Sequence, residues 1–156
     1  MREDFFELAV KKLRARSYSE AEIRQYLSEA GASSAEAEEV LQRLIELSYL
    51  DDYRVAENVV RSLQRGKAGG RLYWQEKLRK RGIRADIIEE ILAGYSGEEE
   101  YRKALELAIT YLQGKAKQNI NQKMRGLTAL LLRRGFSEET VQSVIMEQCD
   151  KCHLQG

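Results

Sequence analysis

The chain has no proline among its 156 residues, one histidine and two cysteines. Both cysteines stand near the C-terminus, which excludes a disulfide framework. The longest aliphatic stretch is LTALLL, far shorter than a membrane span. The N-terminal MREDFFELAV carries acids at positions 3 and 4 and lacks a long apolar core, which argues against a signal peptide. We therefore predict a cytoplasmic protein without membrane association.

Catalytic groupings are missing as well. His153 is the only histidine in the sequence, so no second histidine is present to activate a nucleophile. The carboxylates occur at helical spacings beside lysines and arginines. The segment GKAGG, residues 66–70, lacks the glycine and serine or threonine spacing of a phosphate-binding loop, and no strand precedes it. We predict that the protein is not an enzyme and needs no cofactor.

Positive charge is concentrated in the middle and last parts of the chain, although the net charge is only +1. Residues 1–50 carry 7 basic and 10 acidic side chains, a net of −3. Residues 54–84 carry 10 basic and 2 acidic side chains, a net of +8, and residues 115–134 carry 6 basic side chains and no acid. Such a distribution is typical of a surface that binds phosphates or an acidic protein.

A pattern of apolar positions recurs around three glycines, Gly31, Gly82 and Gly135, which stand 51 and 53 residues apart. Apolar residues occupy the positions 8 and 4 before each glycine and 6, 9 and 10 after it. These columns are Ile23, Trp74 and Leu127; Leu27, Leu78 and Leu131; Ala37, Ile88 and Val141; Val40, Ile91 and Val144; and Leu41, Leu92 and Ile145. The spacing predicts an internal repeat of two helices joined at a left-handed glycine.

An additional amphipathic helix precedes each pair, and Leu, Ala, Glu, Lys and Arg dominate the composition, which suits helices. We predict an all-α, elongated helical-repeat protein of nine helices in three tandem three-helix repeats, over residues 1–50, 51–95 and 96–156. Ser33 and Ser137 are predicted N-caps. Trp74 shares a column with Ile23 and Leu127, so a core position is favoured over base stacking, for which Tyr73 is the better candidate.

Two polar motifs have structural explanations that we favour over metal binding. Asp51 and Asp52 fit a helix N-cap followed by an acid in the first turn. The tail Cys149–His153 matches the C-x-x-C-H pattern of haem attachment and half of a zinc site. Haem attachment of this kind needs export, and zinc needs further ligands, so the end of a helix is the favoured interpretation. Metal binding by a dimer and oxidation of Cys149 with Cys152 stay open.

Residues 48–83 resemble the signature of the RecX family of bacterial recombinase regulators. The matching positions are Leu50, Asp51 and Asp52; Val55 and Ala56; Gly66, Lys67 and Gly69; Arg71; and Arg81, Gly82 and Ile83. The ending LLRRGFSEETV, residues 131–141, is similar to the last repeat of that family. Val55 replaces the usual phenylalanine, Ser48 replaces the usual glycine, and a proline common in the Gly-Lys segment is absent; we interpret these departures as packing variation.

The resemblance implies a partner, the RecA recombinase, bound as a filament on single-stranded DNA whose growth, ATPase, strand-exchange and coprotease activities are restrained. We predict a basic face that contacts RecA, DNA phosphates or both, on a protein that is a monomer. Its residues are Arg61, Arg65, Lys67, Arg71, Tyr73, Arg79, Lys80, Arg81, Lys115, Lys117, Lys123, Arg125, Arg133 and Arg134. The alternatives are a stand-alone nucleic-acid-binding helical module and a repeat scaffold for another protein. Cations that precede Gly82 and Gly135 also have a simpler role in offsetting a helix dipole.

Overall fold

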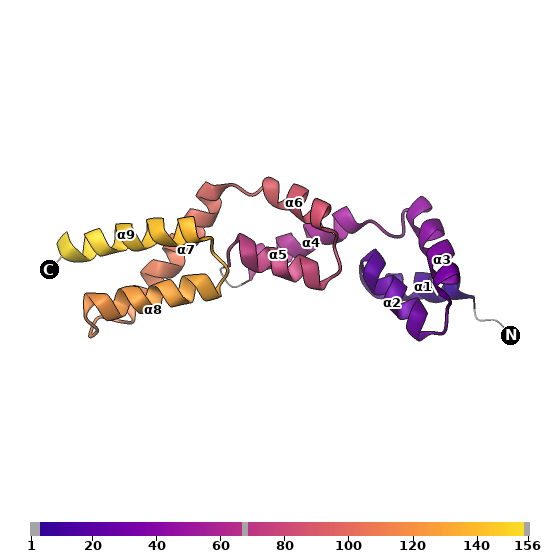
Figure 1. The fold of residues 1–156 in the computed structure, drawn as a ribbon, viewed down its shortest axis with the longest axis horizontal. Coiled ribbons are helices and arrows are strands. Elements are labelled where there is room, and N and C mark those ends of the chain that lie inside the picture. The colour runs from indigo at the N-terminus through magenta and orange to yellow at the C-terminus, as the bar shows by residue number, and fades with distance from the viewer. Residues whose placement is uncertain (1–3, 67–68, 155–156) are drawn as a thin grey trace. The chain divides into compact units, whose positions relative to one another are not determined.

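The computed structural model describes residues 4–66 and 69–154, and all regular structure in this part of the chain is helical (Figure 1). The helices are α1 Phe5–Ala15, α2 Glu20–Glu29, α3 Ser34–Glu46, α4 Asp52–Arg65, α5 Arg71–Lys80, α6 Ala85–Ala93, α7 Gly97–Gln113, α8 Ile120–Arg133 and α9 Glu138–Leu154. The all-α prediction and its nine helices are confirmed for these residues. No helix in the described ranges is long and apolar enough to cross a membrane.

Helix boundaries follow the predicted local signals. Ser33 begins α3 with a reciprocal capping box to Glu36, and Ser137 Oγ accepts a hydrogen bond from Thr140 N at 3.3 Å before α9. Each capping oxygen satisfies a backbone N–H that the helix leaves without a partner. The second helix of each predicted repeat ends at a glycine of positive φ, as the repeat alignment predicted. These glycines are Gly31, Gly82 and Gly135, with φ of 99°, 78° and 78°.

The chain folds as two compact units. The first comprises Met1–Val59 and Lys77–Ile91, and the second comprises Val60–Glu76 and Leu92–Gly156. Helices α1–α3 enclose a core in the first unit, and α7–α9 pack on one another around a core in the second (Figure 1). The helices of the middle predicted repeat contribute to both units. The three repeat boundaries therefore stay a prediction.

The apolar columns form the centre of both units. The side chains at 8 and 4 residues before each glycine are completely buried, and they are Ile23, Leu27, Trp74, Leu78, Leu127 and Leu131. Burial of side chains of this size contributes about 1.5–3 kcal/mol each to stability. The predicted core position of Trp74 is confirmed, and its ring lies 4.2 Å from that of Tyr95 between centroids. Trp74 is thus withdrawn from any base-stacking role.

Candidate functional site: two junctions and the exposed cations

Residues from later in the chain hold the N-terminus of α2 in place through hydrogen bonds. Asp52 Oδ1, on a side chain that is 6% exposed, accepts a hydrogen bond from Glu20 N at 2.9 Å. A carboxylate suits this place because the first N–H groups of a helix are unpaired and carry partial positive charge. Burial raises the pKa of Asp52, and burial followed by the nearby Asp52 charge raises the pKa of Glu20. Asp51 is the N-cap of α4, as predicted, and accepts from Tyr53 N at 3.1 Å.

Arg81 completes this first junction. Its Nε donates to both carboxylate oxygens of Glu22, at 3.1 and 3.0 Å, and its Nη2 donates to the carbonyl of Ser17 at 3.2 Å. The carbonyl of Arg81 accepts from the buried Ser19 hydroxyl. Burial acts to raise the pKa of Glu22, but hydrogen bonds from Arg81 and Ser19 outweigh it and leave that pKa below its ordinary value. The Arg81 guanidinium therefore finds hydrogen-bond partners within this chain.

In the second unit, a buried carboxylate holds the N-terminus of α5 through the same kind of hydrogen bond. Glu100, 4% exposed, accepts from Arg71 N at 3.2 Å and from Ser137 N at 3.1 Å. One buried carboxylate therefore serves the first turns of α5 and α9. The Arg71 guanidinium turns inward and donates to the carbonyl of Tyr95. Burial and the charge of Glu100 raise the pKa of the Tyr95 phenol to about 12, so Tyr95 stays neutral in this cluster.

The glycines allow the backbones to meet at both junctions. Gly70 N donates to Arg134 O at 2.9 Å and Leu72 N donates to Gly135 O at 3.0 Å. A Cβ added to Gly70 would lie 2.6 Å from Phe136 N, and one added to Gly135 would lie 2.6 Å from Tyr73 Cβ. A Cβ on Gly82 would likewise overlap the Cβ of Ala21. The glycine pair at 69–70 thus serves backbone contact, and Tyr73 is packed at the same junction.

These contacts reduce the predicted basic face. The guanidinium groups of Arg71 and Arg81 are engaged by Tyr95 and Glu22, so we take both residues out of the candidate binding surface. Arg61 and Arg65 are exposed on α4, and they form no ion pair within the described ranges. Lys67 lies outside the described residues. Arg79 and Lys80 are exposed on the part of α5 that belongs to the first unit.

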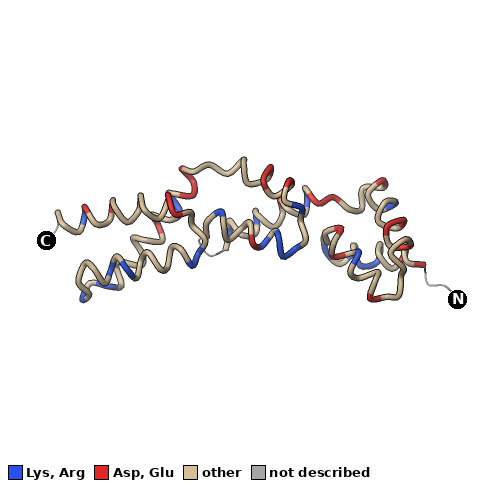
Figure 2. Tube along the Cα trace, viewed as in Figure 1, with Lys and Arg blue, Asp and Glu red and all other residues tan. Residues whose placement is uncertain are grey.

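The second unit carries the remaining predicted cations around α8, which contains no acidic residue (Figure 2). Lys117, Arg125 and Arg133 are exposed, and Lys115, Lys123 and Arg134 are half-buried. Lys115 Nζ stands 5.4 Å from the centre of the Tyr111 ring. A cation-rich helix without acids suits a negatively charged partner. That the cations of both units form one continuous face stays a prediction.

The structure also shows a pocket lined by tyrosines and by charged residues of both signs, Glu22 and Glu29 among them, that sequence reasoning missed. Lys12 Nζ stands 5.1 and 4.4 Å from the ring centres of Tyr18 and Tyr26, beside a pocket of about 380 Å³ that Lys80 also lines. The first repeat is acidic in total, yet Arg16 adds a further cation over Tyr18, at 4.5 Å. Lys12 and Lys80 are far apart in the sequence, so no local pattern could reveal their proximity.

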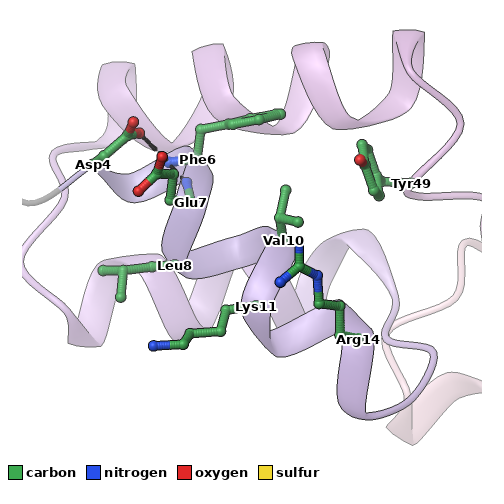
Figure 3. Close-up of a pocket in the computed structure, with 8 residues that line it drawn as sticks. All are labelled: Asp4, Phe6, Glu7, Leu8, Val10, Lys11, Arg14 and Tyr49. Carbon is green, nitrogen blue, oxygen red and sulfur yellow. Dashed lines mark hydrogen bonds between the residues drawn. The ribbon is translucent and has the colours of Figure 1, made fainter.

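A larger pocket of about 580 Å³ lies along α1 (Figure 3). Phe6, Val10 and Tyr49 supply its apolar side, and the rings of Phe6 and Tyr49 meet edge to face at 6.4 Å. Its charged residues are Asp4, Glu7, Lys11 and Arg14. Two charges of each sign give this pocket no preference for an ionic ligand. We therefore assign no role to it.

The C-terminal cysteines are both free thiols, half-buried in the last part of α9. Among the described residues, no group of three or more His, Cys, Asp or Glu side chains is placed to hold a metal ion. Cys149, Cys152 and His153 lie on the last turns of α9, which ends at Leu154. This position agrees with the helix-end interpretation.

The fold is a series of short helices in which buried acids hold the N-termini of α2 and α5, and the helix ends at Gly82 and Gly135 dock beside them. Two family models match, described as the first three-helix domain of RecX over residues 6–44 and the second three-helix domain of RecX over residues 51–92. The chain therefore belongs to the RecX family, which confirms the resemblance seen in residues 48–83. The third repeat lies beyond these two matches.

Curated relatives support the same assignment. The regulatory protein RecX of Pelodictyon phaeoclathratiforme (strain DSM 5477 / BU-1) is 32% identical over 137 residues, which cover 88% of this chain and 84% of that protein. The regulatory protein RecX of Geobacillus sp. (strain WCH70) is 33% identical over 136 residues; the match covers 87% of this chain but half of the longer relative. The crystal structure of RecX from Lactobacillus salivarius shares the fold, with a TM-score of 0.86 at 23% identity over 94% of each chain.

Proposed function

We propose that this protein is a non-catalytic regulator of the RecA recombinase. It binds RecA filaments on single-stranded DNA and restrains their growth, ATPase activity, strand exchange and coprotease activity. The observation that carries this proposal is membership of the RecX family, whose relatives are named regulatory proteins. A RecA partner also places the protein in the cytoplasm, and we infer that it acts there as a monomer.

The exposed cations supply a physical basis for binding. Arg61 and Arg65 on α4, and Lys117, Arg125 and Arg133 around α8, are exposed in the second unit. A RecA filament on single-stranded DNA presents phosphates and carboxylates, and exposed guanidinium groups bind both in a fork geometry. Binding that is largely electrostatic is fast and sensitive to salt. We propose that these residues make the first contacts with the filament.

The test is the RecA ATPase rate on single-stranded DNA with this protein added. We expect inhibition at substoichiometric to equimolar amounts, and a loss of inhibition of about tenfold in potency for a variant with both Arg61→Ala and Arg65→Ala. The matched control carries Lys11→Ala and Arg14→Ala, two exposed cations of α1. Circular dichroism verifies that each variant stays helical.

Three results separate the possibilities. No inhibition by the natural chain at a several-fold excess over RecA would overturn the proposed function. Inhibition that is equally potent in the Arg61 and Arg65 variant would remove these two residues from the site. Tight binding to single-stranded DNA in the absence of RecA, with no added recruitment when RecA is present, would favour a stand-alone nucleic-acid-binding module.

A further inference from the structure

Helix α8 carries a shallow groove of about 500 Å³ on its outer side. We call it the α8 groove, and its lining is Asn121, Met124, Arg125, Thr128, Ala129 and Leu132. Leu132 is 48% exposed, and Thr128 turns its hydroxyl back to the carbonyl of Met124 at 2.7 Å. The hydroxyl of Thr128 is therefore already paired within its own helix. The floor of the groove is an apolar stripe along an otherwise cationic helix.

Comparison of the three repeats shows that this stripe is specific to the last one. Counted from the glycine of the repeat, Met124, Thr128, Ala129 and Leu132 stand 11, 7, 6 and 3 residues before Gly135. The corresponding residues of the first repeat are Glu20, Arg24, Gln25 and Ser28, and those of the second are Arg71, Gln75, Glu76 and Arg79. All eight are charged or polar. The repeat fold therefore does not require an apolar residue at any of these positions, and the stripe needs another explanation.

The groove continues a surface that is used for docking in the other repeats. The residue 10 before the glycine is Ala21 in the first repeat, and it receives Gly82 of the following one. In the second repeat the adjacent residue, Tyr73, receives Gly135. In α8 the counterpart of Ala21 is Arg125, which lines the open groove together with Met124, whereas the counterpart of Tyr73 is Gly126, which packs against the Tyr111 side chain. At Met124 and Arg125 this surface of α8 is thus left open by the described residues.

Cations flank the stripe. Arg125 and Arg133 lie one helical turn before and one turn after Ala129, both are exposed, and α8 has no acidic residue. Neither arginine forms an ion pair within the described part of the chain. An apolar stripe with a positive charge at each end is complementary to an amphipathic segment with acidic residues beside its apolar face.

We propose that the α8 groove binds an acidic, amphipathic segment of a partner protein. Given the function proposed above, on which this inference rests, that segment belongs to RecA. Leu132 and Met124 bury their side chains against the apolar face of the segment, while Arg125 and Arg133 pair with its carboxylates. The groove thereby supplies protein-to-protein specificity, and the exposed cations of α4 supply electrostatic attraction.

Two other occupants fit the observations less well. A nucleic-acid backbone needs cations along its path, but the floor of the groove is apolar and contains no aromatic ring on which a base could stack. A second copy of this chain would have to dock the end of its own α2, at Gly31. That end lacks the arginine found before Gly82 and Gly135, because Ala30 stands there.

The test compares Leu132→Glu with Ile109→Glu, an equally drastic change at a position of α7 that is 43% exposed. The affinity of each variant for free RecA and for RecA filaments on single-stranded DNA is measured by biolayer interferometry. We expect Leu132→Glu to weaken binding about tenfold or more, because an apolar contact is lost and a carboxylate faces acidic residues. Ile109→Glu should change the affinity less than twofold, and Arg125→Glu should weaken it in the same direction as Leu132→Glu.

Folding is verified by thermal unfolding, and Leu132→Ser replaces Leu132→Glu if the latter unfolds. If the natural chain binds RecA and Leu132→Glu binds equally well, the groove is not the docking site, while the proposed function stands. If the natural chain does not bind RecA, the proposed function itself fails. A parallel loss of binding to single-stranded DNA without RecA, or loss of a concentration-dependent dimer in sedimentation, would assign the groove to nucleic acid or to a second copy and overturn the inference.

Discussion

At the scale of single residues, three glycines at equivalent positions have different structural roles. Gly31, Gly82 and Gly135 all have positive φ, which an L side chain adopts at a cost of about 1–2 kcal/mol. A Cβ on Gly31 would meet nothing within 4 Å, whereas one on Gly82 would overlap Ala21 of a neighbouring helix. The sequence pattern predicted the conformation of all three. It contained no sign that Gly82 also provides space for a contact 61 residues away in the chain.

We expect Gly82→Ala to destabilise the protein more than Gly31→Ala. Backbone strain alone should cost about 1 kcal/mol at Gly31, whereas strain and overpacking together should cost about 3 kcal/mol or more at Gly82. Both glycines belong to the first unit, so urea unfolding of the two variants followed by circular dichroism compares them directly. Equal losses would show that Ala21 moves aside freely and that the junction is not closely packed.

Ser48 corrects one interpretation made from the sequence. Its replacement of a usual glycine was attributed to packing variation, but Ser48 is exposed and has a φ of 63°. The position therefore favours glycine because of its backbone conformation and not because of its neighbours. Val55 is 3% exposed, so the packing interpretation is correct there.

At the scale of helices, the two junctions follow one rule. A buried acid from the start of a first helix, Asp52 or Glu100, accepts from the N-terminus of an earlier second helix, and the helix end at Gly82 or Gly135 docks beside it. Caps, apolar stripes and glycine positions were predictable because each depends on residues a few positions apart. The acids were not, since Asp52 and Glu20 are 32 residues apart and Glu100 and Arg71 are 29 apart.

The ion pair between Arg81 and Glu22 should contribute to stability in a pH-dependent way. The folded-state pKa of Glu22 lies below its ordinary value of 4.5, so the contribution is complete above that value and disappears as the pH falls through the lower, folded-state pKa. We expect Arg81→Ala to lower the free energy of unfolding by about 1–2 kcal/mol at pH 7. The difference from the natural chain should shrink steadily below about pH 4.

Denaturant unfolding at several pH values measures this effect. Arg24→Ala is the matched control, since Arg24 pairs with Glu38 at 2.6 Å but both side chains are largely exposed. Exposed pairs contribute little, so the control should lose less stability at pH 7. A loss in Arg81→Ala that does not depend on pH would show that its bond to the Ser17 carbonyl, and not the pair with Glu22, is what stabilises the junction.

Helix α8 departs from the other second helices in length. It has 14 residues, whereas α2 and α5 have 10 each, and the extra turn is at its N-terminal end, since the N-cap lies 16 residues before Gly135 and 12 before Gly31. The added turn contributes Asn121 to the lining of the α8 groove, so the length of α8 and its groove both depart from the pattern of α2 and α5.

For the whole molecule, charge distribution is more informative than net charge. A value of +1 conceals an acidic first repeat and strongly basic segments after it. The sequence predicted where these cations concentrate, but it could not predict which of them the fold would use internally. The guanidinium groups of Arg71 and Arg81 form hydrogen bonds at the two junctions, whereas Arg61 and Arg65 are exposed. Within this basic segment, Arg71 and Arg81 serve the structure of the junctions, and we propose Arg61 and Arg65 for binding.

Salt dependence distinguishes these two groups of arginines. If Arg61 and Arg65 contact filament phosphates, removing both should weaken binding at low salt and make the log–log salt slope shallower by about 1.4, since each contact with a single strand contributes about 0.7. The dissociation constants of the natural chain and of the Arg61→Ala, Arg65→Ala variant for RecA filaments, measured from about 50 to 200 mM NaCl, should then converge as salt rises. Two parallel lines would mean that neither arginine forms an ionic contact with the filament, because a lost non-ionic contact lowers affinity equally at every salt concentration.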